Sequence, residues 1–381
     1  MVTTRLFKTW AEVDLEAVSH NIGRIRDLVG PRVKILVSVK ADAYGHGVYS
    51  VCRAALAAGA EWLGVSHVKE ALELRAFFPR APIMILSAGM LGHSHQIVRN
   101  DLTPVVCSLE IARDLGQEAL SMGKKVKIHC MIDTGMGRIG IWHANALPLL
   151  ERLVRIKGIE VEGLCSHFST ADSPDQDFAR RQLGDFLATA AKAEAKGIGF
   201  SLKHIANSGA LITLPESRLD LVRPGIMIYG IYPADHFKDL IDLKPALSLK
   251  TQVAFLKKVE PGRSISYGRT HITRRETRIA TLPIGYGDGF SRAHSNRGEV
   301  LVRGERAPIV GVVTMDQIMV DVGHIPGVAV GDEVVLIGEQ AGKRITAEEA
   351  AARIDTIPYE VLCQLGKRVS RVYKGKEDKA I

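Results

Sequence analysis

The chain has 381 residues, more than one hydrophobic core usually supports, so we expect two domains or a large barrel with an appendage. Hydrophobic residues make up 46% and charged residues 24% of it, and no apolar run is long enough to span a bilayer. The net charge of +8 is dispersed, and the one basic stretch, Lys367 to Lys379, is interleaved with acids. We therefore expect no nucleic-acid partner.

The opening residues and the cysteines indicate the compartment. Residues 1–22 carry charges throughout and lack the apolar run of a secretory signal, so we expect a cytoplasmic protein that binds no membrane. The five cysteines are widely spaced and include no C-x-x-C pair. This spacing predicts reduced thiols, with neither a disulfide framework nor a metal site.

Short apolar runs alternate with amphipathic stretches over the first two thirds of the chain. The helical spacing of apolar residues is clearest in residues 47–60 and 176–197. Strand-like runs fall at residues 33–40, 61–66, 82–87, 125–133, 159–167 and 203–208. A strand followed by a helix, repeated about eight times, predicts a parallel barrel or a doubly wound sheet.

The pattern changes after Pro245. Short alternating strands broken by Gly and Pro predict a separate antiparallel β domain, as in residues 248–262, 299–313, 316–323 and 332–338. Residues 8–15 precede the first helix and can supply a strand to this second domain.

The segment VKADAYGHG, residues 39–47, places Lys40 at the end of a buried strand, directly before a turn that contains glycine. The carboxyl ends of barrel strands are where catalytic groups gather. A desolvated lysine there has an accessible neutral amine, which can form a Schiff base with an aldehyde. The residues alone leave a plain alternative open, a lysine that extends its amine into solvent.

Two further strand ends carry groups that suit an anion. Asn207, Ser208 and Gly209 follow one apolar run, and RPGI at residues 223–226 follows another. Exposed backbone N–H groups and a hydroxyl at such places can hold a phosphate. Taken singly, these glycines are more often turn formers.

Ten sequence blocks, in order, make the chain resemble the alanine racemase family over essentially its whole length. The blocks are TWAEVDLEAVSHNI, VKADAYGHG, DTGMGRIG, SHFSTAD, HIANSGA, VRPGIMIYG, SYGRT, PIGYGDGF, TMDQIMVDVG and PYEVLCQLGKRV. The resemblance implies an α/β fold, in which residues 14–240 form a (β/α)8 TIM-type barrel that holds pyridoxal 5'-phosphate. Residues 1–13 and 241–381 would form a β-rich domain that completes the active site of the partner in a homodimer.

The resemblance also implies a reaction, the interconversion of L- and D-alanine by a two-base mechanism, which in bacteria generally supplies D-alanine for peptidoglycan. Lys40 would form the internal aldimine with the cofactor and act as one base, and Tyr267 of the partner subunit would act as the other. Two bases on opposite sides of a planar carbanion can remove a proton from one face and deliver one to the other. A phenol is a weak base, so nearby cations must favour its ionised form.

His167 and Arg223 resemble the pair that supplies this help in the family, and Arg223 would also face the pyridine nitrogen of the cofactor. An arginine in place of a carboxylate leaves that nitrogen unprotonated, which favours reprotonation over decarboxylation or transamination. Without the resemblance, an ordinary core histidine and an ion pair would explain these two residues.

The resemblance assigns the remaining site positions as well. The further cofactor-binding residues would be Tyr44, Asn207, Ser208, Gly225, Ile226 and Tyr359. Arg138 and the backbone N–H of Met315 would bind the substrate carboxylate. Asp172 and Tyr286 would lie at the entrance corridor, where Tyr286 limits the size of the substrate side chain.

Met131 departs from the pattern of many family members. They carry a lysine two residues before the aspartate of DTGMGR, modified to a carbamate that orients the arginine, and methionine cannot form this group. Arg138 must then be held by His129, which lies on the same strand face by alternation, or by a bound anion such as chloride.

Three other functions compete with an alanine racemase. They are a broad-specificity or serine racemase, an amino-acid decarboxylase on the same scaffold, and a non-catalytic protein that binds pyridoxal phosphate. Relatives of the last kind generally lack a β domain and a counterpart of Tyr267, so the presence of both favours an enzyme.

Overall fold

A computed structural model describes residues 8–375, and the chain divides into two compact units. The barrel unit comprises residues Val18–Ala43 and Val48–Lys244, and the described part of the β unit comprises residues 8–17, Tyr44–Gly47 and residues 245–375. Residues 1–7 and 376–381 lie outside the described residues. Residues 1–7 belong to the charged opening segment and to the expected β domain. Residues 376–379 are the end of the basic stretch from Lys367 to Lys379.

Eight parallel strands form the barrel unit. In hydrogen-bonded order they are β10 (Leu221–Val222), β2 (Lys34–Ser38), β3 (Trp62–Val65), β4 (Ile83–Ile85), β5 (Thr103–Val106), β6 (Val126–Asp133), β8 (Ile159–Cys165) and β9 (Leu202–His204), and the short β7 (Ile141–Trp142) pairs with β6. Bonds from the Asp220 amide to the Lys203 carbonyl and from the Arg223 amide to the Ala206 carbonyl, both 3.0 Å, join β9 to β10. The predicted barrel is confirmed, and the doubly wound sheet is excluded.

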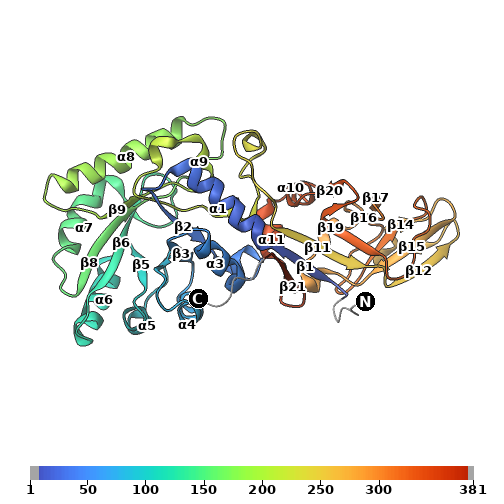
Figure 1. The fold of residues 1–381 in the computed structure, drawn as a ribbon, viewed down its shortest axis with the longest axis horizontal. Helices are drawn as coiled ribbons and strands as arrows, with labels where there is room; N and C mark the ends of the chain where they lie inside the picture. The colour runs from blue at the N-terminus through green and yellow to red at the C-terminus, as the bar shows by residue number, and fades with distance from the viewer. Residues whose placement is uncertain (1–7, 376–381) are drawn as a thin grey trace. The chain divides into compact units, whose positions relative to one another are not determined.

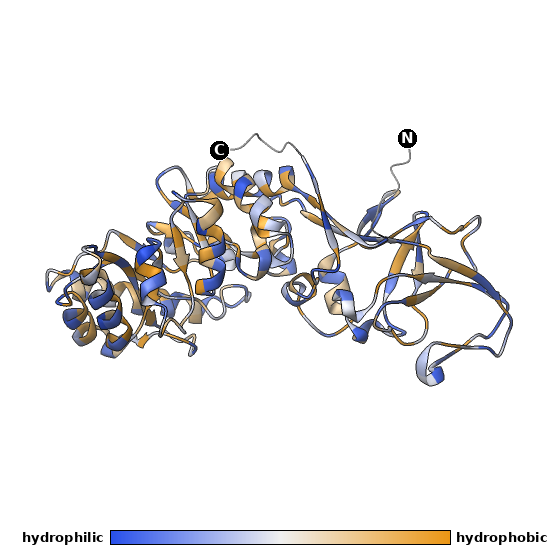
Figure 2. Ribbon diagram, turned by 90° about the horizontal axis from the view of Figure 1, so that it is seen from below, coloured by the Kyte–Doolittle hydropathy of each residue, from blue (hydrophilic) through white to orange (hydrophobic). Residues whose placement is uncertain are grey.

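Helices surround these strands in Figure 1. They are α1 (Leu15–Val29), α3 (Val48–Ala57), α4 (Val68–Phe77), α5 (Ser94–Arg99), α6 (Leu109–Ser121), α7 (Ala146–Leu153), α8 (Asp177–Glu194) and α9 (Ser208–Thr213), with the 3-10 turns η1 (His143–Asn145), η2 (Pro215–Ser217), η3 (Ile226–Tyr229) and η4 (Asp235–Phe237). In α8, for example, Leu183, Phe186 and Ala190 are buried at spacings of three and four, which gives the helix one apolar face. Figure 2 shows this alternation of hydrophobic and hydrophilic residues around the barrel helices.

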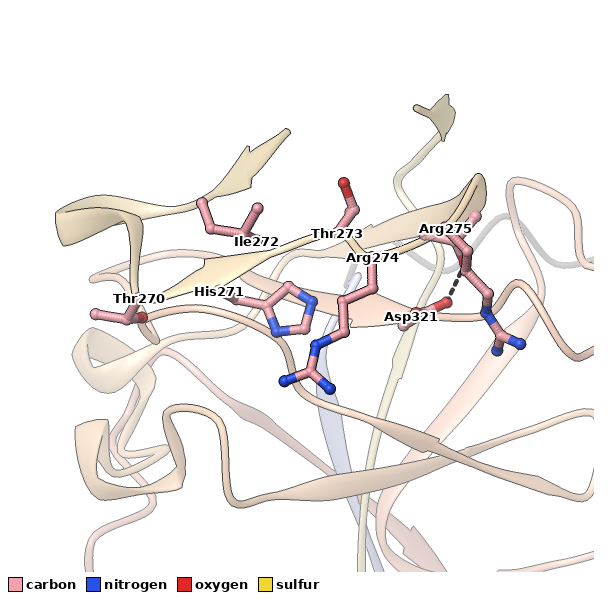
Figure 3. A pocket seen from close by; sticks show the side chains of 8 residues that line it. Thr270, His271, Ile272, Thr273, Arg274, Arg275 and Asp321 are labelled. Carbon is pink, nitrogen blue, oxygen red and sulfur yellow. Dashed lines mark hydrogen bonds between the residues drawn. The ribbon is translucent and has the colours of Figure 1, made fainter. Parts of the chain in front are cut away.

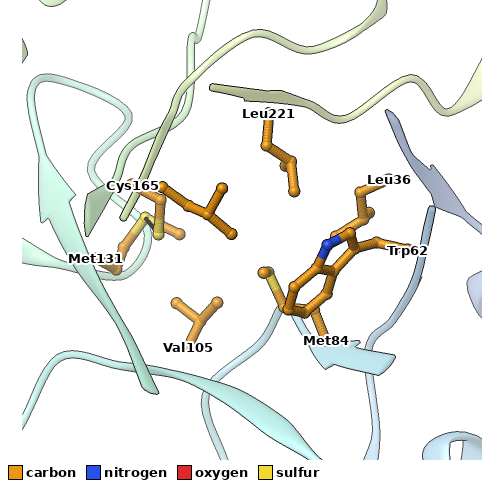
Figure 4. Close-up of a cluster of buried hydrophobic side chains, with 8 residues drawn as sticks. Leu36, Trp62, Met84, Val105, Met131, Cys165 and Leu221 are labelled. Carbon is orange, nitrogen blue, oxygen red and sulfur yellow. Dashed lines mark hydrogen bonds between the residues drawn. The ribbon is translucent and has the colours of Figure 1, made fainter. Parts of the chain in front are cut away.

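The barrel interior contains one buried side chain from each of its eight strands (Figure 4). This interior cluster is Leu36, Trp62, Met84, Val105, Met131, Cys165, Leu202 and Leu221. Met131 belongs to it and is 5% exposed. The position at which many family members carry a modified lysine is therefore part of the apolar core in this chain.

The β unit contains a seven-stranded sheet, a three-stranded sheet and a hairpin. The first has the order β17 (Glu305–Pro308), β16 (Glu299–Val302), β19 (Glu333–Gln340), β11 (Leu247–Gln252), β1 (Trp10–Asp14), β21 (Ser370–Lys374), with β20 (Lys343–Ile345) beside β19. The others are β12 (Phe255–Val259), β15 (Thr277–Leu282), β18 (Ile318–Asp321), and β13 (Ser264–Ile265) with β14 (His271–Ile272). The helical elements are η5 (Tyr267–Arg269), η6 (Tyr286–Asp288), η7 (Arg292–His294), α10 (Ala347–Ala352) and α11 (Pro358–Cys363).

The opening strand β1 pairs antiparallel with β11 and parallel with β21. The prediction that residues 8–15 add a strand to the second domain is thus confirmed, as is the antiparallel character of that domain, with the β1–β21 pair as the exception. Within residues 8–375, no helix is long and apolar enough to cross a bilayer.

Replacing Leu36 with Ala tests the barrel interior. Leu36 is fully buried in the interior cluster, so its loss leaves a cavity, and we expect the free energy of unfolding to fall by about 2–5 kcal/mol. Leu120→Ala, on an exposed position of α6, is the matched control and changes stability by less than about 0.5 kcal/mol. Urea unfolding followed by circular dichroism measures both, and equal effects would contradict the interior placement of Leu36.

Candidate active site

Lys40 is half-buried and follows the end of β2 by two residues. The next four residues, Ala41 to Tyr44, have φ angles between 51° and 55°, so the segment labelled α2 (Lys40–Tyr44) is a left-handed turn. This conformation costs roughly 1–2 kcal/mol per L-residue, so the surroundings must hold it in place. Strained backbone of this kind is found most often at functional sites.

The carboxylate of Glu70 fixes this turn to the end of β3. Its Oε1 accepts a hydrogen bond from the Ala41 amide at 2.7 Å, and its Oε2 accepts bonds from the Ser66 and His67 amides at 2.8 and 3.1 Å. Glu70 therefore helps to set the position of Lys40. Sequence reasoning missed Glu70, because an acid in the first turn of a helix ordinarily serves only as a helix cap.

Arg223, which follows β10, is 7% exposed and makes four hydrogen bonds. Its Nη2 donates to the Ser166 carbonyl at 2.6 Å, to the Ile205 carbonyl at 3.2 Å and to His167 Nδ1 at 3.2 Å, and its Nη1 donates to His204 Nδ1. Burial lowers the pKa of Arg223, but a guanidinium remains protonated in proteins. A permanent positive charge is thus buried against neutral acceptors.

His167 follows β8 and shares its electrostatic environment with three other predicted site residues. Burial lowers its pKa from 6.5 to about 3, and the charges of Arg223, Arg138 and Lys40 add to this effect. Because the Arg223 guanidinium can only donate, His167 Nδ1 must accept, and the ring hydrogen lies on Nε2. The structure therefore brings Lys40, Arg138, His167 and Arg223 together.

Ser208 is the first residue of α9, and its hydroxyl oxygen accepts a hydrogen bond from the Gly225 amide at 2.9 Å. Ile226 begins η3 directly afterwards. Because the Ser208 oxygen accepts this bond, its own hydrogen is left to donate to an anion. Asn207 has another role, since its side chain caps α9 by accepting the Ala210 amide at 3.1 Å.

Asp172 lies on the exposed loop beside the start of α9. A Cβ on Gly209 would stand 3.1 Å from the Asp172 amide nitrogen, so this close approach favours glycine. The Asp172 backbone is thereby placed next to Gly209, the residue that follows Ser208.

The β unit brings Tyr44 and Tyr359 together. Their ring centroids are 6.0 Å apart, at an interplanar angle of 48°. The Arg371 Nε donates to the Gly45 carbonyl at 3.0 Å. Gly47, with a φ of 89°, leaves no room for a Cβ, which would stand 1.9 Å from the Tyr373 hydroxyl. These contacts fix the segment that follows the left-handed turn.

The predicted partner-facing residues lie on exposed turns of the β unit. Tyr267, Met315 and Tyr286 are 74%, 52% and 44% exposed. Tyr286 and Met315 are neighbours, since the amides of residues 286 and 287 donate to the carbonyls of residues 314 and 315 at 3.0 and 2.9 Å. Tyr267 stands between two residues with positive φ, Ser266 and Gly268.

His129 does not hold Arg138. Its Nδ1 lies 2.7 Å from His204 Nε2, and its Nε2 lies 3.3 Å from Glu162 Oε2, so both ring nitrogens are engaged. The prediction that His129 replaces the modified lysine is therefore wrong. Alternation placed His129 on the same face as Met131, but it could not tell which polar group the ring would meet.

An open hollow of about 610 Å³ lies beside β13 and β14 (Figure 3). Its lining residues are Thr270, His271, Ile272, Thr273, Arg274, Arg275, Thr277 and Asp321. None of the predicted site residues lines it, and Asp321 is engaged by the Thr277 hydroxyl at 2.5 Å. The candidate active site is therefore not this hollow.

Comparisons with known proteins match the chain along almost its whole length. The family model for the alanine racemase N-terminal domain matches residues 13–233, and that for the alanine racemase C-terminal domain matches residues 246–373. The chain belongs to the alanine racemase family. It is 48% identical to alanine racemase 2 of Caldanaerobacter subterraneus subsp. tengcongensis over 366 residues, which cover 96% of this chain and 94% of that protein.

Solved structures of the family have the same fold. The alanine racemase of Clostridium difficile 630 superposes with a TM-score of 0.93 at 38% identity, and the match covers 97% of each chain. The enzyme of Bartonella henselae, a structure with covalently bound pyridoxal phosphate, superposes with a TM-score of 0.88 at 29% identity, over 97% of this chain and 100% of that one. The predicted barrel with a C-terminal β domain is confirmed.

The low pKa of His167 predicts a loss of stability in acid. The unfolded chain binds a proton at this histidine below pH 6.5, whereas the folded chain does so only near pH 3, so the free energy of unfolding falls as the pH decreases through that window. The slope due to one such group reaches about 1.4 kcal/mol per pH unit. His167→Asn should remove this component in urea titrations at several pH values. His95→Asn, at a largely exposed ring, is the control, and an unchanged slope in His167→Asn would count against a buried neutral His167.

Proposed function

We propose that the protein is an alanine racemase, a pyridoxal-phosphate-dependent isomerase that interconverts L- and D-alanine and supplies D-alanine for peptidoglycan. The observation that carries this proposal is the buried Arg223, a permanent donor whose acceptors are two imidazoles and two backbone carbonyls. A site with this donor, a strand-end lysine and a phosphate-binding turn suits a pyridine aldehyde with a phosphate group.

The donor set of the chain fits the cofactor. Within residues 8–375 the Nε–H of Arg223 has no hydrogen-bond acceptor, so it is open to a ligand atom that accepts, such as an unprotonated pyridine nitrogen. The Lys40 amine would bind the aldehyde carbon. The phosphate would be held by Ser208 and the Gly225 and Ile226 amides, together with the two tyrosines at positions 44 and 359. When bound to an amino acid, the cofactor withdraws electrons and makes the α-proton acidic.

The residues of the chain would then move the proton. The Lys40 amine would take or return it on one face of the substrate, and the Tyr267 oxygen would do so on the other. The neutral His167 can donate its Nε2–H, which would stabilise an ionised Tyr267 oxygen. Arg138 and the Met315 amide would hold the substrate carboxylate.

We propose a homodimer in which Tyr267 and Met315 of one subunit complete the site of the other. Both side chains, and that of Tyr286 at the proposed entrance corridor, are exposed on the β unit. Tyrosine and methionine are enriched at protein interfaces, so these exposed side chains suit a surface that meets a partner. We also propose a cytoplasmic enzyme without a nucleic-acid partner, in keeping with the buried, protonated thiols of Cys130 and Cys165, whose pKa values are raised by burial.

Heavy-water NMR tests the reaction. Incubating the purified protein and pyridoxal phosphate with L-alanine in heavy water should give D-alanine and should replace the α-proton with deuterium. Formation of ethylamine would indicate a decarboxylase instead. Cofactor binding with no change in alanine would favour the non-catalytic protein, and faster turnover of serine, lysine or arginine would favour a racemase of broader specificity.

Tyr267→Phe tests the second base. We expect the absorption band of the bound cofactor to persist, while proton exchange from one alanine enantiomer falls by about 10²–10⁴-fold, the usual contribution of a general base. Tyr49→Phe, at another exposed tyrosine, should leave the rates unchanged. Mixing Lys40→Ala with Tyr267→Phe chains should restore part of the activity, because a hybrid dimer has one intact site. No restoration would contradict a shared site.

Arg138 leads to a further expectation. It is exposed, and within residues 8–375 no side chain hydrogen-bonds to it, so we propose that chloride or another anion takes the place of the carbamate. After dialysis into halide-free buffer, added chloride should lower the KM for alanine. Arg138→Lys should weaken this dependence. Activity that does not respond to halide would contradict the proposal.

A further inference from the structure

A continuous chain of polar side chains crosses the barrel unit from Arg223 to Lys127. Arg223 Nη1 bonds His204 Nδ1, and His204 Nε2 lies 2.7 Å from His129 Nδ1. His129 Nε2 lies 3.3 Å from Glu162 Oε2, and Glu162 Oε1 accepts the Lys127 Nζ at 2.6 Å. His129 and His204 are completely buried, whereas the Lys127 side chain is 53% exposed. The chain therefore links the surface to the proposed cofactor site.

The strands are locally modified to admit this chain. Ile128 pairs with Val161 and His129 pairs with Gly163, so Glu162 is the extra residue of a β-bulge in β8. Bulges redirect side chains, and they occur often beside active sites. A Cβ on Gly163 would stand only 2.2 Å from His129 Nδ1, so glycine provides the space in which the ring lies.

His129 also lies within the apolar interior of the barrel. It lies two residues before Met131 on β6, and its ring meets the Trp62 ring at a centroid distance of 6.0 Å. Burying two imidazoles and a carboxylate among apolar side chains costs free energy unless every polar atom is paired. A purely structural core would be built more simply from apolar residues.

The hydrogen positions along this row of hydrogen-bonded side chains follow from the groups at its two ends, Arg223 and Glu162. A guanidinium only donates, so His204 Nδ1 carries no hydrogen and His204 Nε2 does. His204 Nε2–H then donates to His129 Nδ1, which places the hydrogen of His129 on Nε2, where it donates to Glu162. A carboxylate held by Lys127 only accepts. Both ends thus impose the same orientation on two neutral imidazoles.

We propose that Glu162 is a positioning residue that fixes the orientation of Arg223 and provides the counter-charge for its buried guanidinium through His129 and His204. Through this chain, Glu162 sets the field that Arg223 presents to the cofactor ring. The catalytic part of the inference rests on the proposed function, whereas the hydrogen positions do not.

The charges around these hydrogen-bonded side chains agree with the role proposed for Glu162. The hydrogen bond from His129 is the main cause that lowers the pKa of Glu162 to about 2, so Glu162 is ionised. Burial lowers the pKa of both His129 and His204, which keeps the rings neutral. The other charges nearby are Lys127 and Glu160 at the surface end, and Lys40 and Arg138 beside His167 at the other end.

The first test is NMR of the wild-type protein labelled with 15N-histidine, with signals assigned by single histidine substitutions. We expect both His129 and His204 to carry a hydrogen on Nε2 alone across the neutral pH range. A charged ring, or a hydrogen on Nδ1 of either residue, would overturn the proposal. This measurement needs no variant of Glu162 and no turnover.

The second test compares Glu162→Gln with Glu160→Gln, an exposed position two residues earlier on β8. In Glu162→Gln, the pH midpoint at which the absorption band of bound pyridoxal phosphate changes should fall by about half a unit or more. The reason is that the buried Arg223 guanidinium loses its counter-charge. We expect kcat to fall about tenfold with KM within about twofold of the wild type, by analogy with residues that orient metal ligands, whose loss costs about 10–100-fold in activity. Glu160→Gln should match the wild type in all three.

An unshifted titration in a folded Glu162→Gln protein would overturn the role of Glu162 even if kcat fell. If Glu162→Gln does not fold, the 15N signals of His129 and His204 in the wild-type protein test the proposal by themselves. If the protein racemises no alanine but the signals and the titration shift are as expected, the proposed function fails and the positioning role stands.

Discussion

The buried guanidinium of Arg223 constrains the architecture of the barrel unit. A charge removed from water costs several kcal/mol unless hydrogen bonds replace its hydration. The chain meets this need with two backbone carbonyls and two imidazoles, and one of those imidazoles, His204, leads through His129 to the carboxylate of Glu162. The carbonyls that accept from Arg223 come from residues 166 and 205, at the ends of β8 and β9. The neighbouring ends of β8 and β9 therefore fix the position of the charge.

The strained backbone after Lys40 is a second source of unfavourable free energy, which local contacts offset. Four consecutive residues adopt the left-handed conformation, which only glycine adopts without a penalty. The carboxylates of Glu70 and Asp42 hold this turn, Glu70 through the Ala41 amide at 2.7 Å and Asp42 through the Val48 amide at 2.8 Å. The turn ends at Tyr44, whose ring lies beside that of Tyr359. Lys40 and Tyr44, which we propose binds the phosphate, are thus fixed four residues apart by one strained segment.

Much of the fold was predictable because alternation and helical spacing act locally. Two barrel strands are not predicted from such patterns, because β5 begins with Thr103 and Pro104 and β10 has two residues, so neither forms a long apolar run. The run at residues 203–208 is predicted to be one strand, yet α9 begins at Ser208, because the Asn207 side chain caps a helix there. The candidate site residues follow from the family resemblance, whereas Glu70 and Glu162 make their contacts across strands. Such contacts leave no mark in the local sequence, which is also why the role expected for His129 was wrong.

The central claim is that Arg223 is a fixed donor and therefore that the ring nitrogen of the bound cofactor is an acceptor. The most direct measurement is the 15N chemical shift of that nitrogen in the protein reconstituted with ring-labelled pyridoxal phosphate. We expect the shift of an unprotonated pyridine, unchanged across the neutral pH range. The shift of a pyridinium would contradict it, because two donors cannot share one hydrogen bond.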